Sequence, residues 1–155
     1  MIPKTFARVL SFIVRSLGFK QAGWNILFRA GISYGGPSPL LAEFVSTQVK
    51  AGFIVEHGCG NGSLPRQLKP ETFARYVGYD ISAEAVLQAK KANPNCEFYC
   101  QPMEAWQDES KPVDLIICKE VAYYLSEADL RAFIQRALAA LKPGGRVIIT
   151  IHDPE

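Results

Sequence analysis

A short apolar run that ends in an acid and passes directly into a glycine-rich loop constrains this chain more than any other stretch. Residues 53–55 are Phe, Ile and Val, Glu56 follows, and glycines then stand at alternate positions 58, 60 and 62. A short apolar run bounded by turn residues is typical of a buried parallel strand. Glycine permits a tight turn and a close approach of a ligand to the backbone. The stretch therefore predicts a buried strand that leads into a nucleotide-binding loop.

The residues after the loop predict a short helix. Ser63 is a favourable N-cap, and Pro65 suits the first helical turn. We expect this helix over residues 64–68, with its end before Pro70. The N-terminus of such a helix would add free backbone N–H groups to the loop.

The spacing of the glycines restricts the kind of nucleotide. A dinucleotide fingerprint requires G-x-G-x-x-G, whereas this loop has G-x-G-x-G. A triphosphate-binding loop requires a lysine after its glycines, and no Lys or Arg stands between Lys50 and Arg66. An acid at the end of the strand favours a ligand with positive charge, such as an amino group or a sulfonium.

Apolar strands and helices alternate from residue 52 onward. We expect strands over residues 53–56, 76–80, 97–100, 113–118 and 147–151. Ser82 is expected to cap a helix over residues 83–92, and Ser126 a helix that ends at the Pro-Gly-Gly of residues 143–145. Five short apolar strands separated by helices predict an α/β fold whose parallel sheet is covered on both faces.

Several stretches resemble the class I S-adenosylmethionine (SAM) dependent methyltransferases. Residues 56–62 fit that family's [DE]-x-G-x-G-x-G, and the acid Asp80 ends the next strand in Y-V-G-Y-D-I-S. Residues 114–125 resemble its D-L-I-x-x-x-E-V-L-Y-Y-L, and residues 141–145 its L-K-P-G-G turn. The resemblance covers residues 52–151 and is nearest to the small-molecule N-methyltransferases of the NodS type.

The resemblance implies a Rossmann-like three-layer sandwich around a mainly parallel five-stranded sheet of order 3-2-1-4-5. Members of the family continue with strands six and seven, and this sequence ends at Glu155 without them. The C-terminal part of the fold is therefore expected to be missing, which would leave strand five as a bare apolar edge. Either the chain is a fragment of a longer protein, or the N-terminal segment or a partner covers this edge. We expect self-association through that edge and an incomplete or weakly active form of the enzyme.

The resemblance also implies the residues that bind SAM. Asp80 would accept hydrogen bonds from the ribose hydroxyls, and Ile81 would lie against the adenine. Pro102 replaces the acid that usually receives the adenine amino group, so the Met103 N–H and Glu104 are expected to contact the base instead. The residues expected to bind the cofactor are Glu56, His57, Gly58, Cys59, Gly60, Gly62, Asp80, Ile81, Met103, Glu104 and Lys119.

Methyl transfer from a sulfonium needs alignment more than acid or base catalysis, so no catalytic residue is predicted firmly. By location, the candidates for an optional base are Tyr34, Tyr123, Tyr124 and His152. No metal site is expected, because the chain has no C-x-x-C pair and its two histidines are not at metal spacing. The four cysteines are interpreted as reduced thiols of a cytoplasmic protein.

Residues 1–51 are expected to form an N-terminal helical segment that precedes the SAM-binding domain over residues 52–155. An amphipathic helix is predicted over residues 4–19, a linker within 22–42, and a helix from Ser38 or Pro39. Five basic residues precede the first acid, Glu43. We expect the first helix to pack on the domain; the alternative is contact of residues 1–20 with an anionic membrane surface.

Two hypotheses for function remain open. The first is a SAM-dependent methyltransferase that methylates a nitrogen or oxygen of a small molecule. The second is a SAM-fold binding module without turnover, held at a partner or membrane by its basic N-terminal helix. Nucleic acid is not an expected partner, because [DNS]-P-P-[YFW], the motif for methylating an exocyclic amine of a base, is absent. The acceptor depends on loops that the fold does not specify.

Overall fold

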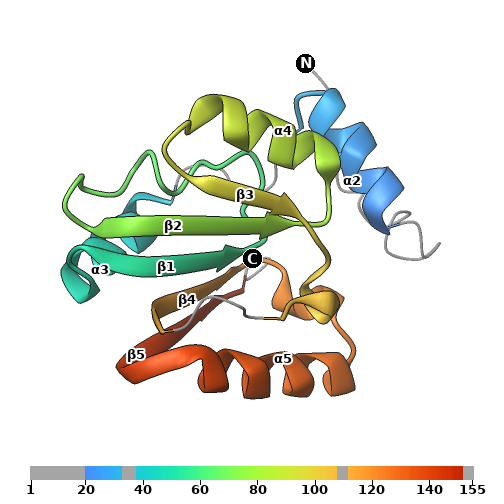
Figure 1. The fold of residues 1–155 in the computed structure, drawn as a ribbon. Helices are drawn as coiled ribbons and strands as arrows, with labels where there is room; N and C mark the ends of the chain where they lie inside the picture. The colour runs from blue at the N-terminus through green and yellow to red at the C-terminus, as the bar shows by residue number, and fades with distance from the viewer. Residues whose placement is uncertain (1–19, 33–37, 108–111, 152–155) are drawn as a thin grey trace.

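A five-stranded parallel sheet forms the centre of the computed structural model, which describes residues 20–32, 38–107 and 112–151. Its order is β3-β2-β1-β4-β5 (Figure 1), as the sequence predicts. The strands are β1 (Gly52–His57), β2 (Phe73–Asp80), β3 (Glu97–Cys100), β4 (Val113–Lys119) and β5 (Leu141–Thr150). The helices are α2 (Lys20–Arg29), α3 (Pro39–Gln48), α4 (Ala83–Ala92) and α5 (Glu127–Ala140), with 3-10 turns η1 (Met103–Ala105) and η2 (Ala122–Tyr124).

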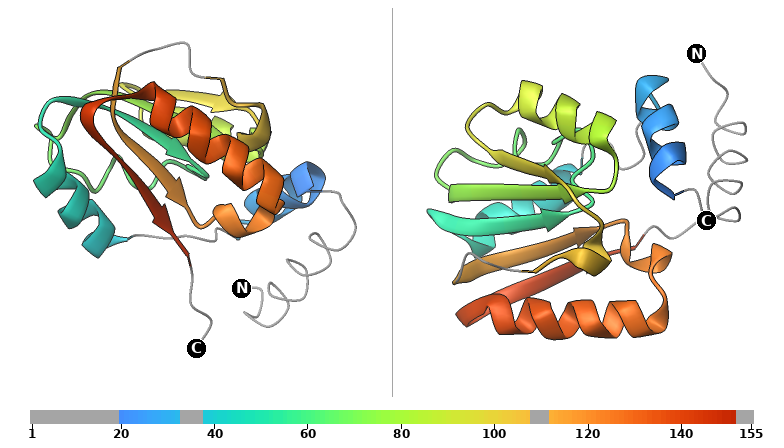
Figure 2. Two further views of the ribbon diagram at one scale, coloured as in Figure 1. Left: turned by 90° about the horizontal axis from the view of Figure 1, so that it is seen from below. Right: turned by 45° about the vertical axis from the view of Figure 1, so that its right-hand side comes forward.

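The two faces of the sheet bury separate cores. Side chains of a strand alternate between the faces, so neighbouring residues of β1 point in opposite directions. Ile54 packs with apolar residues of α3 and α4 on one face. Val55 packs with Phe133 and Ala137 of α5 on the other. Two views of the ribbon in Figure 2 show these layers, and the Rossmann-like three-layer sandwich is confirmed.

Both capping serines act as the sequence predicts. The Ser82 hydroxyl accepts a hydrogen bond from the Ala85 N–H at 3.2 Å, and α4 begins directly after it. The Ser126 hydroxyl accepts from the Asp129 N–H at 3.1 Å at the start of α5. Each hydroxyl oxygen accepts a hydrogen bond from an N–H group that would otherwise lack a partner at the start of a helix. The local sequence therefore determines where both helices begin.

The helix predicted over residues 64–68 is wrong. Residues 60–67 form consecutive turns instead, with the Gln67 N–H donating to the Leu64 carbonyl at 2.9 Å. Gly60 and Gly62 have positive φ, so the backbone is non-helical up to the residue before Ser63. Leu64 is fully buried in the core, so packing of this side chain, and not helix propensity, determines the local backbone.

Two other local predictions are corrected. The proposed linker over 22–42 contains a helix, α2, which two fully or nearly fully buried side chains, Leu27 and Phe28, hold against the domain. The Pro-Gly-Gly turn does not end α5, which ends at Ala140; residues 141–145 already belong to β5. The pairing of β4 with β5 shifts register there, between Val113 and Leu115.

Strand β5 lies at the edge of the sheet that the structure describes and pairs with β4. Its Ile149 is 41% exposed. Self-association through this edge stays a prediction, as does the division of the chain at residue 51. The helix predicted over residues 4–19 lies outside the described residues. Over the ranges that the structure describes, no helix combines the length and the apolar character needed to cross a bilayer.

Candidate functional site

A pocket opens at the carboxyl ends of the strands, which is where ligands bind in open parallel α/β sheets. Its walls come from the glycine loop, the ends of β2 and β4, the two 3-10 turns and helix α2. Figure 1 shows α2 next to α4, on the side of the sheet to which the arrowheads point. The lining residues are Trp24, Phe28, residues 57–61, 79–81, 101–104, 119–121 and 123–125.

The glycine loop is wedged between the ends of two strands. The N–H groups of Gly58 and Cys59 both donate to the Tyr79 carbonyl, at 2.8 and 3.1 Å. Gly58 has φ +77°, and a Cβ there would lie 2.4 Å from Cγ1 of Val121 and 2.8 Å from the Lys119 carbonyl oxygen. Only glycine therefore fits this position without displacing backbone.

Asp80 ties this loop to the start of α4. Its Oδ2 accepts from the Gly60 N–H at 2.9 Å, and its Oδ1 accepts from the Ser82 N–H at 2.8 Å. Burial raises the pKa of the Asp80 carboxyl, while the backbone N–H groups act in the opposite direction. Each carboxylate oxygen has a further lone pair, so Asp80 can hold the loop and still accept from a ligand.

Two of the predicted binding residues lie behind the loop and do not line the pocket. Glu56 is fully buried, and the Tyr76 hydroxyl donates to its Oε2 at 2.6 Å. Its Oε1 has no hydrogen-bond partner among the described residues, and burial raises its pKa to about 7. Gly62 faces Asn93, whose Nδ2 would lie 2.5 Å from an added Cβ. Ligand contact by either residue stays a prediction.

His57 lies on the opposite face from Glu56 and forms part of the pocket wall. Its ring stacks on Tyr79 at 5.3 Å between centroids and meets Trp106 and Phe133 edge-on. Neither ring nitrogen has a hydrogen-bond partner within the described parts of the chain. Burial, and to a smaller extent the nearby positive charge of Arg136, lowers its pKa to about 3. The imidazole is therefore neutral at physiological pH.

We expect the neutrality of His57 to make the fold sensitive to acid. In the unfolded chain His57 takes up a proton as pH falls below about 6.5, whereas in the folded chain it stays neutral down to about pH 3. The free energy of unfolding therefore falls as pH falls through this window. The loss is about 1.4 kcal/mol per pH unit at most. Urea unfolding at a series of pH values measures it.

The matched variant is His57→Leu, which fills the same apolar site without titrating. Glu56 acts in the opposite sense, because its raised pKa makes folding favour proton uptake as pH falls below about 7, but it is present in both proteins. The parent should lose stability relative to the variant on acidification. Parallel losses in the two proteins would contradict the assignment.

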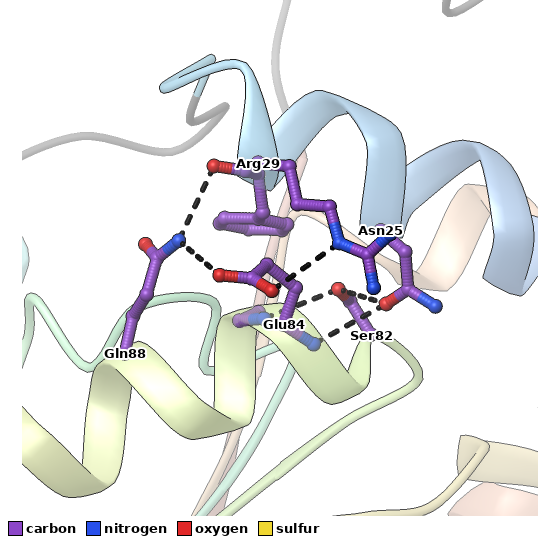
Figure 3. A network of polar contacts seen from close by, with 7 residues as sticks. Asn25, Arg29, Ser82, Glu84 and Gln88 are labelled. Atoms are coloured by element: carbon purple, nitrogen blue, oxygen red, sulfur yellow. Dashed lines mark hydrogen bonds and ion pairs between the residues drawn. The ribbon is translucent and has the colours of Figure 1, made fainter.

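Helix α2 supplies a wall of the pocket that sequence reasoning missed. Figure 3 shows the polar contacts that hold it on α4. The Asn25 Oδ1 accepts from the Ser82 hydroxyl at 2.8 Å and from the Glu84 N–H at 3.3 Å. An ion pair of 3.4 Å joins Arg29 to Glu84, and Gln88 donates to the Phe28 carbonyl at 3.2 Å. The spacing of Trp24 and Phe28, four residues apart, is the signal that indicates a shared helix face.

The opposite wall of the pocket is formed by the residues that come after β4 in the chain. Tyr123 and Tyr124, candidates for a base, both line the pocket, with ring centroids 4.5 Å apart. Trp24 of α2 meets Tyr124 edge-on at 5.8 Å. The other two candidates, Tyr34 and His152, lie outside the described residues.

The structure brings most of the predicted binding residues together. These pocket-lining residues are His57, Gly58, Cys59, Gly60, Asp80, Ile81, Met103, Glu104 and Lys119. They come from four separate stretches of the chain, and the parallel sheet places all four at one edge. A loop of backbone, a carboxylate and an apolar recess together suit a ligand that joins a nucleoside to a polar, positively charged group.

Comparison of the chain with known proteins identifies similar proteins. A family model described as "Methyltransferase domain" matches residues 54–145. A trans-aconitate 2-methyltransferase of Azoarcus sp. (strain BH72) is 35% identical over 105 residues, which are 67% of this chain and 40% of that protein. A ubiquinone biosynthesis O-methyltransferase of Chelativorans sp. (strain BNC1) is 30% identical over 100 residues, 62% of this chain and 38% of that protein.

A solved structure shares the fold. The N-methyltransferase NodS from Bradyrhizobium japonicum WM9, in complex with S-adenosyl-L-homocysteine (SAH), superposes with a TM-score of 0.64 at 22% identity. The match covers 72% of this chain and 58% of that one. The match spans about two fifths of the length of the trans-aconitate and ubiquinone methyltransferases.

Proposed function

This chain belongs to the methyltransferase domain family, and we propose that it binds SAM in the pocket and passes the methyl group to a nitrogen or oxygen of a small molecule. The observation that carries the proposal is the glycine loop, held at one pocket wall by Asp80 through the Gly60 N–H. The acid and the loop meet at the edge of the sheet where nucleotides bind. The relatives' acceptors differ, which leaves nitrogen and oxygen both open.

In this proposal each wall has a separate task. The backbone of residues 58–60 lies against the ligand, and the Asp80 carboxylate accepts from the ribose hydroxyls. Ile81 and Met103 hold the adenine between them, with Glu104 beside it. The Lys119 backbone and the neutral His57 border the amino acid part. Glu56 supports the loop from behind through its hydrogen bond with Tyr76.

Bound SAM supplies an electrophilic methyl carbon, which an acceptor lone pair attacks while the carbon–sulfur bond breaks and its electron pair stays on sulfur. The chain contributes alignment of the two reactants and exclusion of water. Trp24 and Phe28 of α2 cover the pocket, and Tyr123 and Tyr124 border the acceptor side. Either tyrosine hydroxyl can orient the acceptor by a hydrogen bond, and only its ionised form could receive the acceptor's proton; a base is not required.

Isothermal calorimetry with SAM, SAH and NAD tests binding. We expect SAM and SAH to bind with one-to-one stoichiometry and NAD not to bind, because the G-x-G-x-G loop lacks the dinucleotide spacing. Transfer of a labelled methyl group to a panel of small amines, carboxylic acids and phenols tests turnover. Absence of SAM and SAH binding would contradict the proposal. Binding without turnover on any acceptor would favour the binding-module hypothesis.

Three expectations on location and partners stay predictions. They are a cytoplasmic location, self-association through β5, and packing of the first helix on the domain, to which contact of residues 1–20 with a membrane surface is the alternative. Co-sedimentation with anionic vesicles tests the membrane contact. Light scattering over a range of concentrations tests the association.

A further inference from the structure

We propose that the methyl acceptor carries a positively charged amine, which binds against Glu120 between aromatic side chains of α2 and η2. The proposal rests on the function proposed above and adds the substrate class. Three observations support it: the backbone and carboxylate of Glu120, the aromatic side chains that line the same pocket, and the balance of charge in the pocket.

The backbone of Glu120 is hydrogen-bonded to β5 at the pocket wall. It follows β4 directly, and its N–H donates to the Thr150 carbonyl at 3.2 Å. Its φ is +56°, in the left-handed region that residues other than glycine rarely adopt. A non-glycine residue in this region has a cost in stability, and such residues cluster at functional sites.

One oxygen of the Glu120 carboxylate has no donor among the described residues. Its Oε2 is buried and has no hydrogen-bond partner within residues 20–32, 38–107 and 112–151. A buried carboxylate oxygen without a donor is costly, so a donor from a ligand would be bound favourably there. An amine presents N–H donors and a positive charge together, which gives the stronger, charge-assisted form of this bond.

Aromatic side chains line the pocket alongside Glu120. Tyr123 and Tyr124 follow it in the chain, and Trp24 reaches the same pocket from α2. The faces of Trp and Tyr rings attract cations within about 6 Å of the ring centroid. A carboxylate combined with these rings favours a cation over a neutral polar group of the same size.

The charge balance points the same way. Three carboxylates, Asp80, Glu104 and Glu120, line the pocket with one lysine, Lys119, and His57 is neutral there. Both oxygens of Asp80 already accept backbone hydrogen bonds. The pocket is therefore negative as a whole, and Glu120 holds the acceptor that no described group occupies.

The experiment compares two probes of the same shape. Benzylamine is positively charged at neutral pH, and benzyl alcohol is neutral. Each is titrated by calorimetry into the full chain, with and without saturating SAH. We expect benzylamine to bind about tenfold more tightly than benzyl alcohol, from one charge-assisted hydrogen bond. In Glu120→Gln this preference should disappear, while SAH affinity stays within about twofold of the parent.

Glu104→Gln is the matched control, because it removes the same charge from another residue of the same pocket. It should retain the preference for benzylamine. Equal binding of the two probes by the parent, or a preference that survives Glu120→Gln, would overturn the proposal. A Glu120→Gln variant that loses SAH affinity but keeps the amine preference would also overturn it, because Glu120 would then hold the cofactor's ammonium.

The two proposals fail separately. If SAH does not bind, the methyltransferase proposal fails, whereas the probe comparison without SAH still decides the amine preference. If SAH binds and the probes are not distinguished, only the substrate class is wrong. Circular dichroism and urea unfolding show whether each variant is folded before its titration is interpreted.

Discussion

Replacing Gly58 with alanine should abolish SAH binding and lower the free energy of unfolding by about 3 kcal/mol. Two effects add. The residue has φ +77°, and its new Cβ would lie 2.8 Å from the Lys119 carbonyl oxygen and 2.4 Å from Cγ1 of Val121. Because the first of these neighbours is backbone, the loop or the end of β4 must move. Urea unfolding and calorimetry with SAH measure the two losses.

Gly144→Ala is the matched control for this variant. Gly144 also has positive φ, +81°, but a Cβ there meets nothing within 4 Å. It should lose only the left-handed backbone term, about 1 kcal/mol, and retain SAH binding. If the two variants lose the same stability and both bind SAH, crowding at the glycine loop is not what requires Gly58.

Asp80→Ala should weaken SAH binding by roughly tenfold to a hundredfold. The substitution removes the proposed ribose acceptor and also the oxygens that receive the N–H groups of Gly60 and Ser82. Asp80→Asn keeps one acceptor oxygen and should fall between the parent and the alanine variant. Calorimetry with SAH gives the order of the three proteins.

Asp114→Ala separates binding from stability. Asp114 likewise accepts a hydrogen bond from the backbone, from the Phe53 N–H at 2.9 Å, and it pairs with Lys142. It lies at the opposite end of β4 from the pocket. Its loss should lower the free energy of unfolding and leave SAH affinity unchanged. Equal loss of affinity in Asp80→Ala and Asp114→Ala would mean that Asp80 acts only through the fold.

The parts of the fold that follow local patterns could be predicted from the sequence. Helix α4 begins and ends where the sequence places it, at Ala83 and Ala92, because the Ser82 hydroxyl caps its start. Strand β3 likewise matches, at Glu97–Cys100. Strands β1, β2 and β4 are longer than predicted by one to three residues, because backbone pairing continues past the apolar run.

The parts that depend on distant partners could not be predicted. Helix α2 carries glycine and asparagine and reads as a linker, but Asn25 reaches Ser82, 57 residues away in the chain. The same reason explains Glu56. A predicted strand gives its face of the sheet, but nothing local shows that the hydroxyl of Tyr76 meets it there. Pocket walls assembled from remote segments are visible only in three dimensions.

The backbone of Glu120 implies a conflict between robustness and activity. At φ +56° the backbone conformation is about 1 kcal/mol more favourable for glycine than for glutamate. Selection for thermal stability alone would therefore favour glycine at this position. That substitution would remove both the backbone strain and the Glu120 carboxylate from the pocket. A chain that keeps glutamate here has retained a less stable residue at the wall of its pocket, and a consensus-style redesign for heat tolerance should leave this position untouched.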